Sequence, residues 1–255
     1  QKKNPDANQP QVGEESTPEK IAFALSTCGA ADTPLDAGCQ KWAELLNQTG
    51  LFDVTVYNNS QLGNVVDVLD RLIDGDVIAE AVSASDIADP LNIPDLKATM
   101  APFLFDSIDD INTLTQSDWF AALADQAASQ GVKIVAANLI NGERYFITKK
   151  PVAEPADMKG MKIRVPNNTN YINTFTAFGC APTPMAATEI YTSLQTSVVD
   201  GMEHPLPDCL ANGYYEIAKY ISNQDYLKEM NMFAVSKTLW DQCTEEQQKA
   251  LVDCA

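Results

Sequence analysis

Short apolar runs alternate with segments of helical periodicity along the first half of the chain. Residues 20–27 have strand composition, and the Thr33-Pro34 pair then begins a helix whose apolar positions recur at i, i+3 and i+4 as far as Gly50. A second strand and helix follow, and this helix ends at Gly75. The pattern predicts four further elements in this half: a strand over 77–85, helices over 107–114 and 119–128, and a strand over 132–137.

A second series of alternating elements begins near Asn141. It contains predicted strands over 144–148, 161–166 and 201–206, a helical turn at 154–160, and helices over 168–178 and 188–198. Because strands and helices alternate throughout, we expect an α/β fold with mainly parallel strands. Two such series, separated by a crossing of the chain, predict two lobes, and open α/β sheets bind ligands at the carboxyl ends of their strands.

Arg164 stands inside the apolar strand "MKIRVP" and raises the first functional question. In a half-buried strand, Met161, Ile163 and Val165 share the core face, whereas Lys162 and Arg164 face the other side. The structural interpretation of Arg164 is therefore a solvent-exposed strand edge. The functional interpretation is a binding residue, because Arg164 lies at the carboxyl end of a strand, where the cleft is predicted.

The charge of the chain restricts the class of partner. The 255 residues carry a net charge of -18, and a chain without a basic surplus does not neutralise the phosphates of nucleic acid or of an anionic membrane. Residues 1–18 are polar and rich in Pro, Gln, Asn and Glu, so we expect a disordered leader. Such a leader suits a chain cut after an export signal, or after a lipid-bearing cysteine, although an arbitrary start would look the same.

Six cysteines are present without a CxxC pair, and His204 is the single histidine, so the spacing of a zinc site is absent. An even number of cysteines in an exported chain favours disulfides. Sequence neighbours suggest three pairs: Cys28–Cys39, Cys180–Cys209 and Cys243–Cys254. The alternative is that all six are buried and reduced, and the last two could lie on one helix, too far apart to bridge.

Catalytic motifs are absent from the sequence. It contains no GxSxG, no glycine-rich phosphate loop and no HExxH, and its carboxylates are too scattered to single out a catalytic pair. A Cys–His nucleophile with His204 is formally possible, but an oxidised cysteine is a poor nucleophile. We therefore predict a binding protein without cofactor or metal, with a hydrolytic enzyme as the remote alternative.

Three stretches carry a resemblance to a known family: "YNNSQLGN", "NGERYFITKKPVAEPADMKGMKIRVPNN" and "APTPMAATEIYTSLQTSVVDGMEHPL". They resemble the substrate-binding proteins of tripartite ATP-independent periplasmic (TRAP) transporters, of the dicarboxylate-binding (DctP) type, and the similarity runs from Lys20 to the last residue. The resemblance implies a two-lobed periplasmic-binding-protein-like fold with a ligand cleft between two mixed, mainly parallel sheets. It also implies a periplasmic or extracellular monomer that binds a small organic acid and delivers it to the membrane subunits of a sodium-driven TRAP permease. A receptor of the same fold that serves a sensor system is the alternative.

The resemblance also implies which residues bind the ligand. The arginine that clamps the carboxylate in the family falls on Arg164 of "KIRVP", and a guanidinium matches a carboxylate with two parallel donors. A second arginine of the family falls on Arg144. The structural alternative for Arg144 is a salt bridge to Glu143 or to another acid across the hinge.

The helix from Thr188 and the strand after it line the cleft in the family, which adds Tyr191 and Glu203 as ligand-binding candidates. Two positions depart from the family pattern. Ala187 replaces a common aromatic residue and leaves volume for a bulkier ligand. His204 replaces an asparagine and can still donate to a carboxylate, with a charge that changes near neutral pH; the alternative is a packed, neutral histidine.

The resemblance finally suggests how the chain is divided. Residues 19–142 form the first lobe, residues 143–224 the second, and residues 225–255 return to the first lobe after the leader of residues 1–18. Family members continue with a long helix that braces both lobes. We therefore interpret the sequence as truncated, with a short variant as the alternative.

Overall fold

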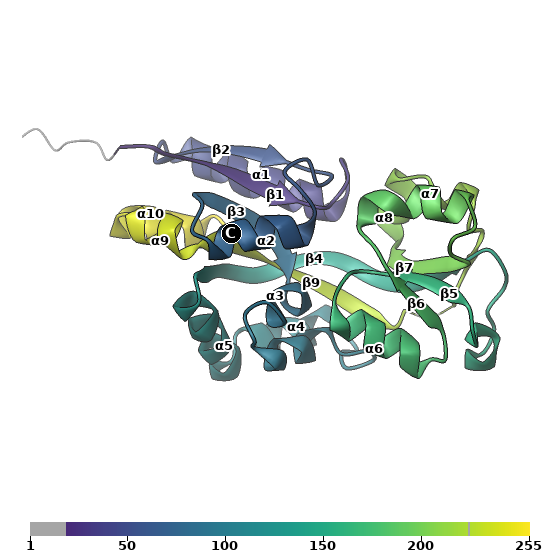
Figure 1. The fold of residues 1–255 in the computed structure, drawn as a ribbon. Helices are drawn as coiled ribbons and strands as arrows, with labels where there is room; N and C mark the ends of the chain where they lie inside the picture. Colours follow the sequence, from purple (N-terminus) through teal and green to yellow (C-terminus); the bar gives the residue numbers. More distant parts are fainter. Residues whose placement is uncertain (1–18, 224) are drawn as a thin grey trace, which may run out of the picture.

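The computed structural model describes residues 19–223 and 225–255, so the leader predicted for residues 1–18 lies outside the described residues. Two lobes lie side by side and are joined by long strands (Figure 1). None of the helices in these ranges is both long enough and apolar enough to cross a membrane. The predicted α/β architecture with two lobes is confirmed, but the two mainly parallel sheets that the resemblance implied are one continuous mixed sheet, because antiparallel strands join the lobes.

The described strands form one mixed sheet in the order β2-β1-β3-β9-β4-β7-β5-β6, and β8 pairs with β4. Their bounds are β1 (Ile21–Thr27), β2 (Phe52–Tyr57), β3 (Ile78–Ser83), β4 (Val132–Thr148), β5 (Lys162–Val165), β6 (Ala181–Pro184), β7 (Gly201–Pro205), β8 (Tyr220–Ile221) and β9 (Leu227–Ser236). The strands pair in parallel in β1–β2 and β1–β3 of the first lobe and in β5–β6 and β5–β7 of the second.

The α-helices cover the two faces of this sheet. Their bounds are α1 (Pro34–Gln48), α2 (Val65–Ile73), α3 (Ala84–Ala88), α4 (Ile108–Thr115), α5 (Asp118–Ser129), α6 (Thr169–Ala177), α7 (Ile190–Gln195), α8 (Leu206–Ala211), α9 (Lys237–Gln242) and α10 (Glu245–Asp253). Short 3-10 helices are η1 (Pro94–Met100), η2 (Pro155–Met158), η3 (Ala187–Glu189) and η4 (Tyr214–Glu216). Several helices begin at the predicted residues, because side chains such as Thr33 and Ser107 cap their free N–H groups.

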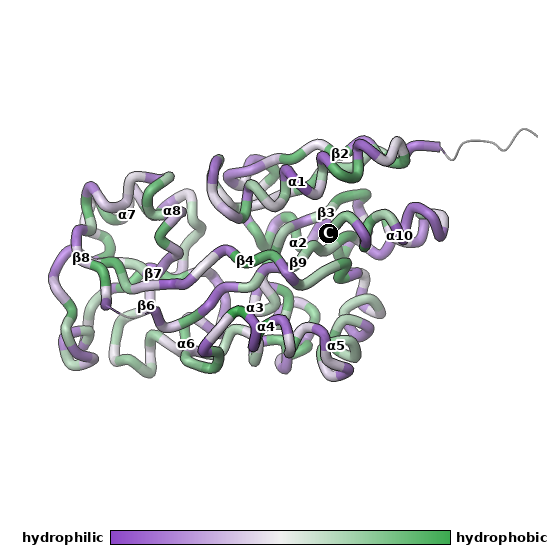
Figure 2. The backbone as a smooth tube through the Cα atoms, turned by 180° about the vertical axis from the view of Figure 1, so that it is seen from behind, coloured by the Kyte–Doolittle hydropathy of each residue, from purple (hydrophilic) through white to green (hydrophobic). Residues whose placement is uncertain are grey.

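The antiparallel pair of β4 and β9 connects the lobes and makes the two halves of the sheet continuous (Figure 1). The apolar pattern predicts two strands, over 132–137 and 144–148, where the structure has the single strand β4. The register of β4 against β9 shifts at three places between Ile134 and Gly142, and these irregularities interrupt the period-2 pattern. Seen from behind, hydrophilic residues occur in both strands where they pass between the lobes (Figure 2).

Each lobe buries apolar side chains on both faces of its part of the sheet. On β9, Met232 and Ala234 pack into one cluster of the first lobe, whereas Phe233 and Val235 pack into the cluster on the opposite face. In the second lobe, Ile163 and Met202 likewise lie in separate clusters. Because both faces are covered, neighbouring residues of a strand are buried together, which explains the continuous apolar runs in the sequence.

The predicted disulfides are wrong, since all six cysteines are free. Cys180 and Cys209 belong to different hydrophobic clusters. Cys243 and Cys254 flank the nine-residue helix α10. Because an α-helix rises about 1.5 Å per residue, the helix is longer than the Cα separation that a disulfide spans. Burial raises the pKa of the Cys39 thiol to about 12. The alternative that all six are buried and reduced holds for four of them, which act as small apolar side chains, whereas Cys28 and Cys254 are reduced but only partly buried.

Candidate ligand-binding cleft

A cavity of about 910 Å³ lies between the two lobes. Its walls come from the loop after β1 and from α2 and α3 on one side, and from β5, α6, η3, β7 and α8 on the other, with β4 and β9 also contributing. Carboxyl ends of strands from both lobes meet here, as expected for open α/β sheets. Of the six residues predicted to bind ligand, five line this cavity: Arg144, Arg164, Ala187, Tyr191 and His204.

Arg164 lies on β5 with a side chain that is 3% exposed, so it does not occupy a solvent-exposed strand edge. Its Nε and Nη2 donate to the carbonyl oxygen of Met185 at 3.1 and 2.9 Å. Among the described residues, no carboxylate forms an ion pair with this guanidinium. Burial, together with the charge of Arg144, lowers the pKa of Arg164, and the charge of Glu203 opposes that change.

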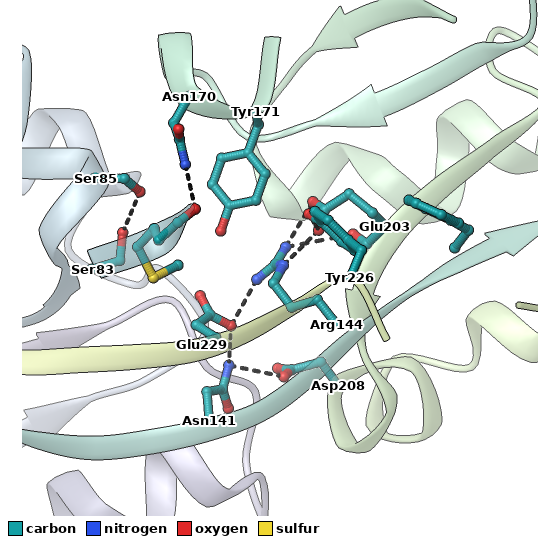
Figure 3. Close-up of polar contacts among 12 residues, drawn as sticks. Ser83, Ser85, Asn141, Arg144, Asn170, Tyr171, Glu203, Asp208, Tyr226 and Glu229 are labelled. Atoms are coloured by element: carbon teal, nitrogen blue, oxygen red, sulfur yellow. Dashed lines mark hydrogen bonds and ion pairs between the residues drawn. The ribbon is translucent and has the colours of Figure 1, made fainter. Parts of the chain in front are cut away.

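Arg144 lies on β4 and is saturated by acids of its own chain (Figure 3). Its Nε and Nη2 donate to the two carboxylate oxygens of Glu203 at 2.5 and 2.7 Å, and its Nη1 donates to Glu229 at 2.7 Å. The guanidinium also lies 5.1 Å from the ring centre of Tyr171. The predicted alternative of a salt bridge therefore holds with Glu203 and Glu229, whereas Glu143 accepts from the hydroxyl of Tyr145. A ligand contact through Arg144 stays a prediction.

His204 lies on β7 and is buried beside the ring of Tyr214, with ring centres 5.9 Å apart. Burial and the charges of Arg144 and Arg164 lower the pKa of His204 well below its ordinary value. The imidazole is therefore neutral, and the expected change of charge near neutral pH is wrong. Its Nδ1 is buried and has no hydrogen-bond partner among the described residues.

The remaining predicted residues occupy three different positions. Ala187 begins η3 at the cavity wall. Tyr191 is partly exposed on α7, and its hydroxyl donates to Glu216 at 3.2 Å. Glu203 is fully buried behind Arg144 rather than on the wall, and it also accepts from the hydroxyl of Tyr226 at 2.7 Å. The structure therefore gives Glu203 the role of holding Arg144.

Among the cavity residues that were not predicted are three polar ones on β4, α8 and β9: Asn141, Asp208 and Glu229. The Asn141 Nδ2 group donates to Asp208 at 3.3 Å and to Glu229 at 3.1 Å (Figure 3). The register shift between Ile140 and Gly142 makes Asn141 an extra residue of β4, so that Asn141 and Arg144 both line the cavity despite their odd spacing. One sequence signal could have identified Glu229. It is an acidic residue within a largely apolar strand, and charged residues are rarely buried unless they are paired.

Side chains of the first lobe also reach α6 across the cavity. Asp86 accepts from Asn168 at 2.7 Å, and Asp89 accepts from the hydroxyl of Thr169 at 2.7 Å. These contacts join α3 to the N-terminus of α6 at one side of the cavity. Within the described residues, no group of three or more His, Cys, Asp or Glu side chains is arranged to hold a metal ion.

Comparison with known proteins gives consistent results. The chain is 31% identical over 227 residues to the C4-dicarboxylate-binding periplasmic protein DctP of Rhodobacter capsulatus, covering 88% of this chain and 67% of that one. It is 28% identical over 248 residues to the sialic acid-binding periplasmic protein SiaP of Vibrio cholerae, covering 90% and 77%. A TRAP periplasmic solute-binding protein of Actinobacillus succinogenes, solved with bound L-galactonate, matches with a TM-score of 0.88 at 30% identity, covering 92% and 78%.

The chain spans 62% and 61% of the length of two other curated relatives that it matches. The family model of the bacterial extracellular solute-binding proteins, family 7, matches residues 25–255. This match includes both lobes and every residue of the cavity described above. As the resemblance predicted, the chain belongs to this DctP family of extracellular solute-binding proteins.

Proposed function

We propose that the protein is an extracytoplasmic receptor that binds a small organic acid in this cleft and delivers it to a sodium-driven TRAP permease. Membership of the solute-binding family supports the proposal. Relatives named above bind a C4-dicarboxylate, sialic acid and L-galactonate, all of which carry a carboxylate. They are binding proteins, so we propose no catalytic reaction. A monomeric state and a lipid anchor stay predictions from the sequence.

The buried, unpaired guanidinium of Arg164 is the observation that carries the proposal. A buried charge without a counter-ion is costly, and the costs are offset when an opposite charge with matching hydrogen-bond geometry is supplied. The carbonyl of Met185 accepts two hydrogen bonds from Arg164 but brings no charge. A ligand carboxylate in the cavity would be the missing counter-ion. Its negative charge would raise the pKa of Arg164, which burial lowers.

The other cavity residues have distinct roles in this proposal. Arg164 anchors the carboxylate, and the neutral imidazole of His204 lines the same cavity. Ala187 and Tyr191 define one wall, where the small alanine leaves space for a ligand substituent. Arg144 is held by Glu203, and we propose that it positions the wall and adds positive potential near the carboxylate.

The test combines ligand identification with titration. Mass spectrometry of the small molecule released on denaturation identifies an acid, which is then titrated calorimetrically into wild type, Arg164→Ala and Arg164→Lys. We expect Arg164→Ala to weaken binding by about 30-fold to several thousand-fold, because truncation of one partner of a desolvated charge pair costs about 2–5 kcal/mol. Arg164→Lys should recover part of the affinity, since an ammonium keeps the charge without the bidentate geometry.

Arg71→Ala is the matched control, because Arg71 is exposed and pairs with Asp76 outside the cavity. This variant should bind the acid like wild type. Circular dichroism checks that each variant folds. If folded Arg164→Ala binds the acid as tightly as the control, Arg164 is not the anchor and the proposal is wrong in its central residue.

A further inference from the structure

Two arginines line the cavity, and they differ in whether their charge is paired. Arg164 and Arg144 are the cationic side chains among the described residues of the cavity wall. The guanidinium of Arg164 donates to the uncharged carbonyl of Met185. Arg144 instead forms ion pairs with two carboxylates, those of Glu203 and Glu229. Within the described part of the chain, the cavity therefore offers a ligand one unpaired positive charge, that of Arg164.

The two acids contact different parts of the Arg144 guanidinium. Glu203 is fully buried, does not line the cavity, and accepts from the Nε and Nη2 groups. Glu229 on β9 does line the cavity, and its Oε2 accepts from Arg144 Nη1 at 2.7 Å and from Asn141 Nδ2 at 3.1 Å (Figure 3). These two hydrogen bonds hold the Glu229 carboxylate against the arginine. Glu229 therefore occupies the donor that Arg144 would otherwise present to a ligand.

The other charged side chains of the cavity wall are acidic. They are Asp86, Asp89, Glu189 and Asp208. Asp89 pairs with Lys97, whereas the other three have no cationic partner within ion-pair distance among the described residues. A second carboxylate on a ligand would therefore meet charges of its own sign, and such contacts reduce affinity.

Two helix N-termini at the cavity wall are also occupied. Asn64 lines the cavity and caps α2, since its Oδ1 accepts from two N–H groups of the first turn. Asn168 lines the cavity and caps α6 in the same way. A helix N-terminus attracts anions through its free N–H groups, but here side chains of the protein already accept from them. Neither helix end therefore substitutes for the positive charge of Arg144.

We propose that Glu229 determines the charge of the ligand: by occupying Arg144, it makes the cavity selective for a monoanion whose single carboxylate binds Arg164. This inference rests on the proposed function, because it assigns the part of the ligand that Arg164 does not bind. The expected class is a monocarboxylic acid whose other groups are uncharged. A dicarboxylate is disfavoured, since its second carboxylate finds no unpaired cation. The ligand therefore differs in charge from the C4-dicarboxylate named for the Rhodobacter relative.

The test compares diacids with their monoamides, which have the same length and one negative charge fewer. Succinate, glutarate, adipate and the monoamide of each are titrated calorimetrically into the full chain at about pH 8, where their carboxyl groups are ionised. We expect wild type to bind the best monoamide at least about tenfold more tightly than the diacid of equal length, because like charges repel in the cavity. Glu229→Gln should reduce this preference to about threefold or less, since a neutral amide leaves charge of Arg144 available to the second carboxylate.

Glu143→Gln is the matched control for Glu229→Gln. Glu143 is exposed, lies next to Arg144 on β4 and does not line the cavity, so this variant removes the same charge without freeing the Arg144 donor. It should keep the preference of wild type. An equal change in the two variants, or no change in Glu229→Gln, overturns the role of Glu229. Each preference is a ratio of two affinities in one variant, so a partial loss of folded protein cancels.

Arg164→Lys separates this inference from the proposed function. It acts on the carboxylate that both series share, so it should weaken diacids and monoamides by a similar factor. Diacids that bind wild type as tightly as their monoamides, with a dependence on Arg164, overturn the inference and leave the proposed function standing. A dianion identified by mass spectrometry after release from the denatured protein has the same consequence. Failure of every probe to bind wild type counts against the inference and the proposed function together.

Discussion

At the scale of single residues, the contact that organises the cleft is the buried pair of Arg144 and Glu203. Glu203 uses both oxygens on Arg144 and accepts a further hydrogen bond from Tyr226. We predict that Glu203→Ala lowers the free energy of unfolding by about 3–5 kcal/mol, because it leaves a buried guanidinium short of a counter-ion. Urea unfolding measures the change. The control is Glu143→Ala, because Glu143 is exposed and lies next to Arg144 on β4. It should lower the free energy of unfolding by about 0.5 kcal/mol or less. Equal losses in the two variants would contradict the prediction.

At the scale of elements, the bulge of β4 decides which side chains enter the cleft. Gly142 has a φ of 121°, a region that side-chain-bearing residues rarely adopt, and an added Cβ would meet no atom within 4 Å. Gly142→Ala therefore acts through the backbone, and we predict a loss of about 1–3 kcal/mol in the free energy of unfolding. It should also weaken ligand binding, because Asn141 and Arg144 flank this residue.

Gly50→Ala is the matched control for the bulge. Gly50 has a φ of 77°, follows α1 outside the cavity, and also has open space at the Cβ position. It should lower stability by about 1–2 kcal/mol without changing ligand affinity. Calorimetric titration compares the ligand affinities of both variants with that of wild type. An unchanged affinity of Gly142→Ala would show that the bulge does not position the cleft residues.

At the scale of the whole molecule, buried acids make stability depend on pH. The pKa of Asp208 is raised from 3.8 to about 6, so the folded protein binds a proton that the unfolded chain releases between these values. The free energy of unfolding therefore falls as pH rises through this window, and Asp208 alone accounts for about 3 kcal/mol of the fall. We predict that Asp208→Asn removes that part of the fall in stability. The check is the difference in thermal stability between the variant and wild type, measured from about pH 3 to pH 7.5.

Asp110→Asn gives a contrast of opposite sign. The hydrogen bonds from Ser107 lower the pKa of exposed Asp110, so its contribution is present above the unfolded pKa and is lost as pH falls below it. This variant should differ from wild type near neutral pH and approach it in acid. A difference between wild type and Asp208→Asn that is constant across the pH range would contradict the assignment of Asp208 as a proton-binding group.

Local pattern was sufficient to predict most elements and the position of Arg164. Helix caps, period-2 strands and the alternation of strands with helices are properties of neighbouring residues, and they are confirmed in α1, α2, α4, β1 and β5. The family resemblance, which rests on ordered motifs, is also confirmed. The predicted disulfides failed because cysteine spacing does not determine whether two thiols come within bonding distance.

The partners of the cleft residues were decided by tertiary structure alone. The acids at Glu203 and Glu229 lie 59 and 85 residues from Arg144 along the chain, and strand pairing brings them together. A bulge in β4 turns Asn141 toward the same cavity, and the register of one strand is not visible in its own sequence. The sequence by itself determined the fold class, the family and a candidate anchor, because these depend on local pattern. Burial and long-range pairing determined that Arg144 is occupied, Arg164 is unpaired and His204 is neutral.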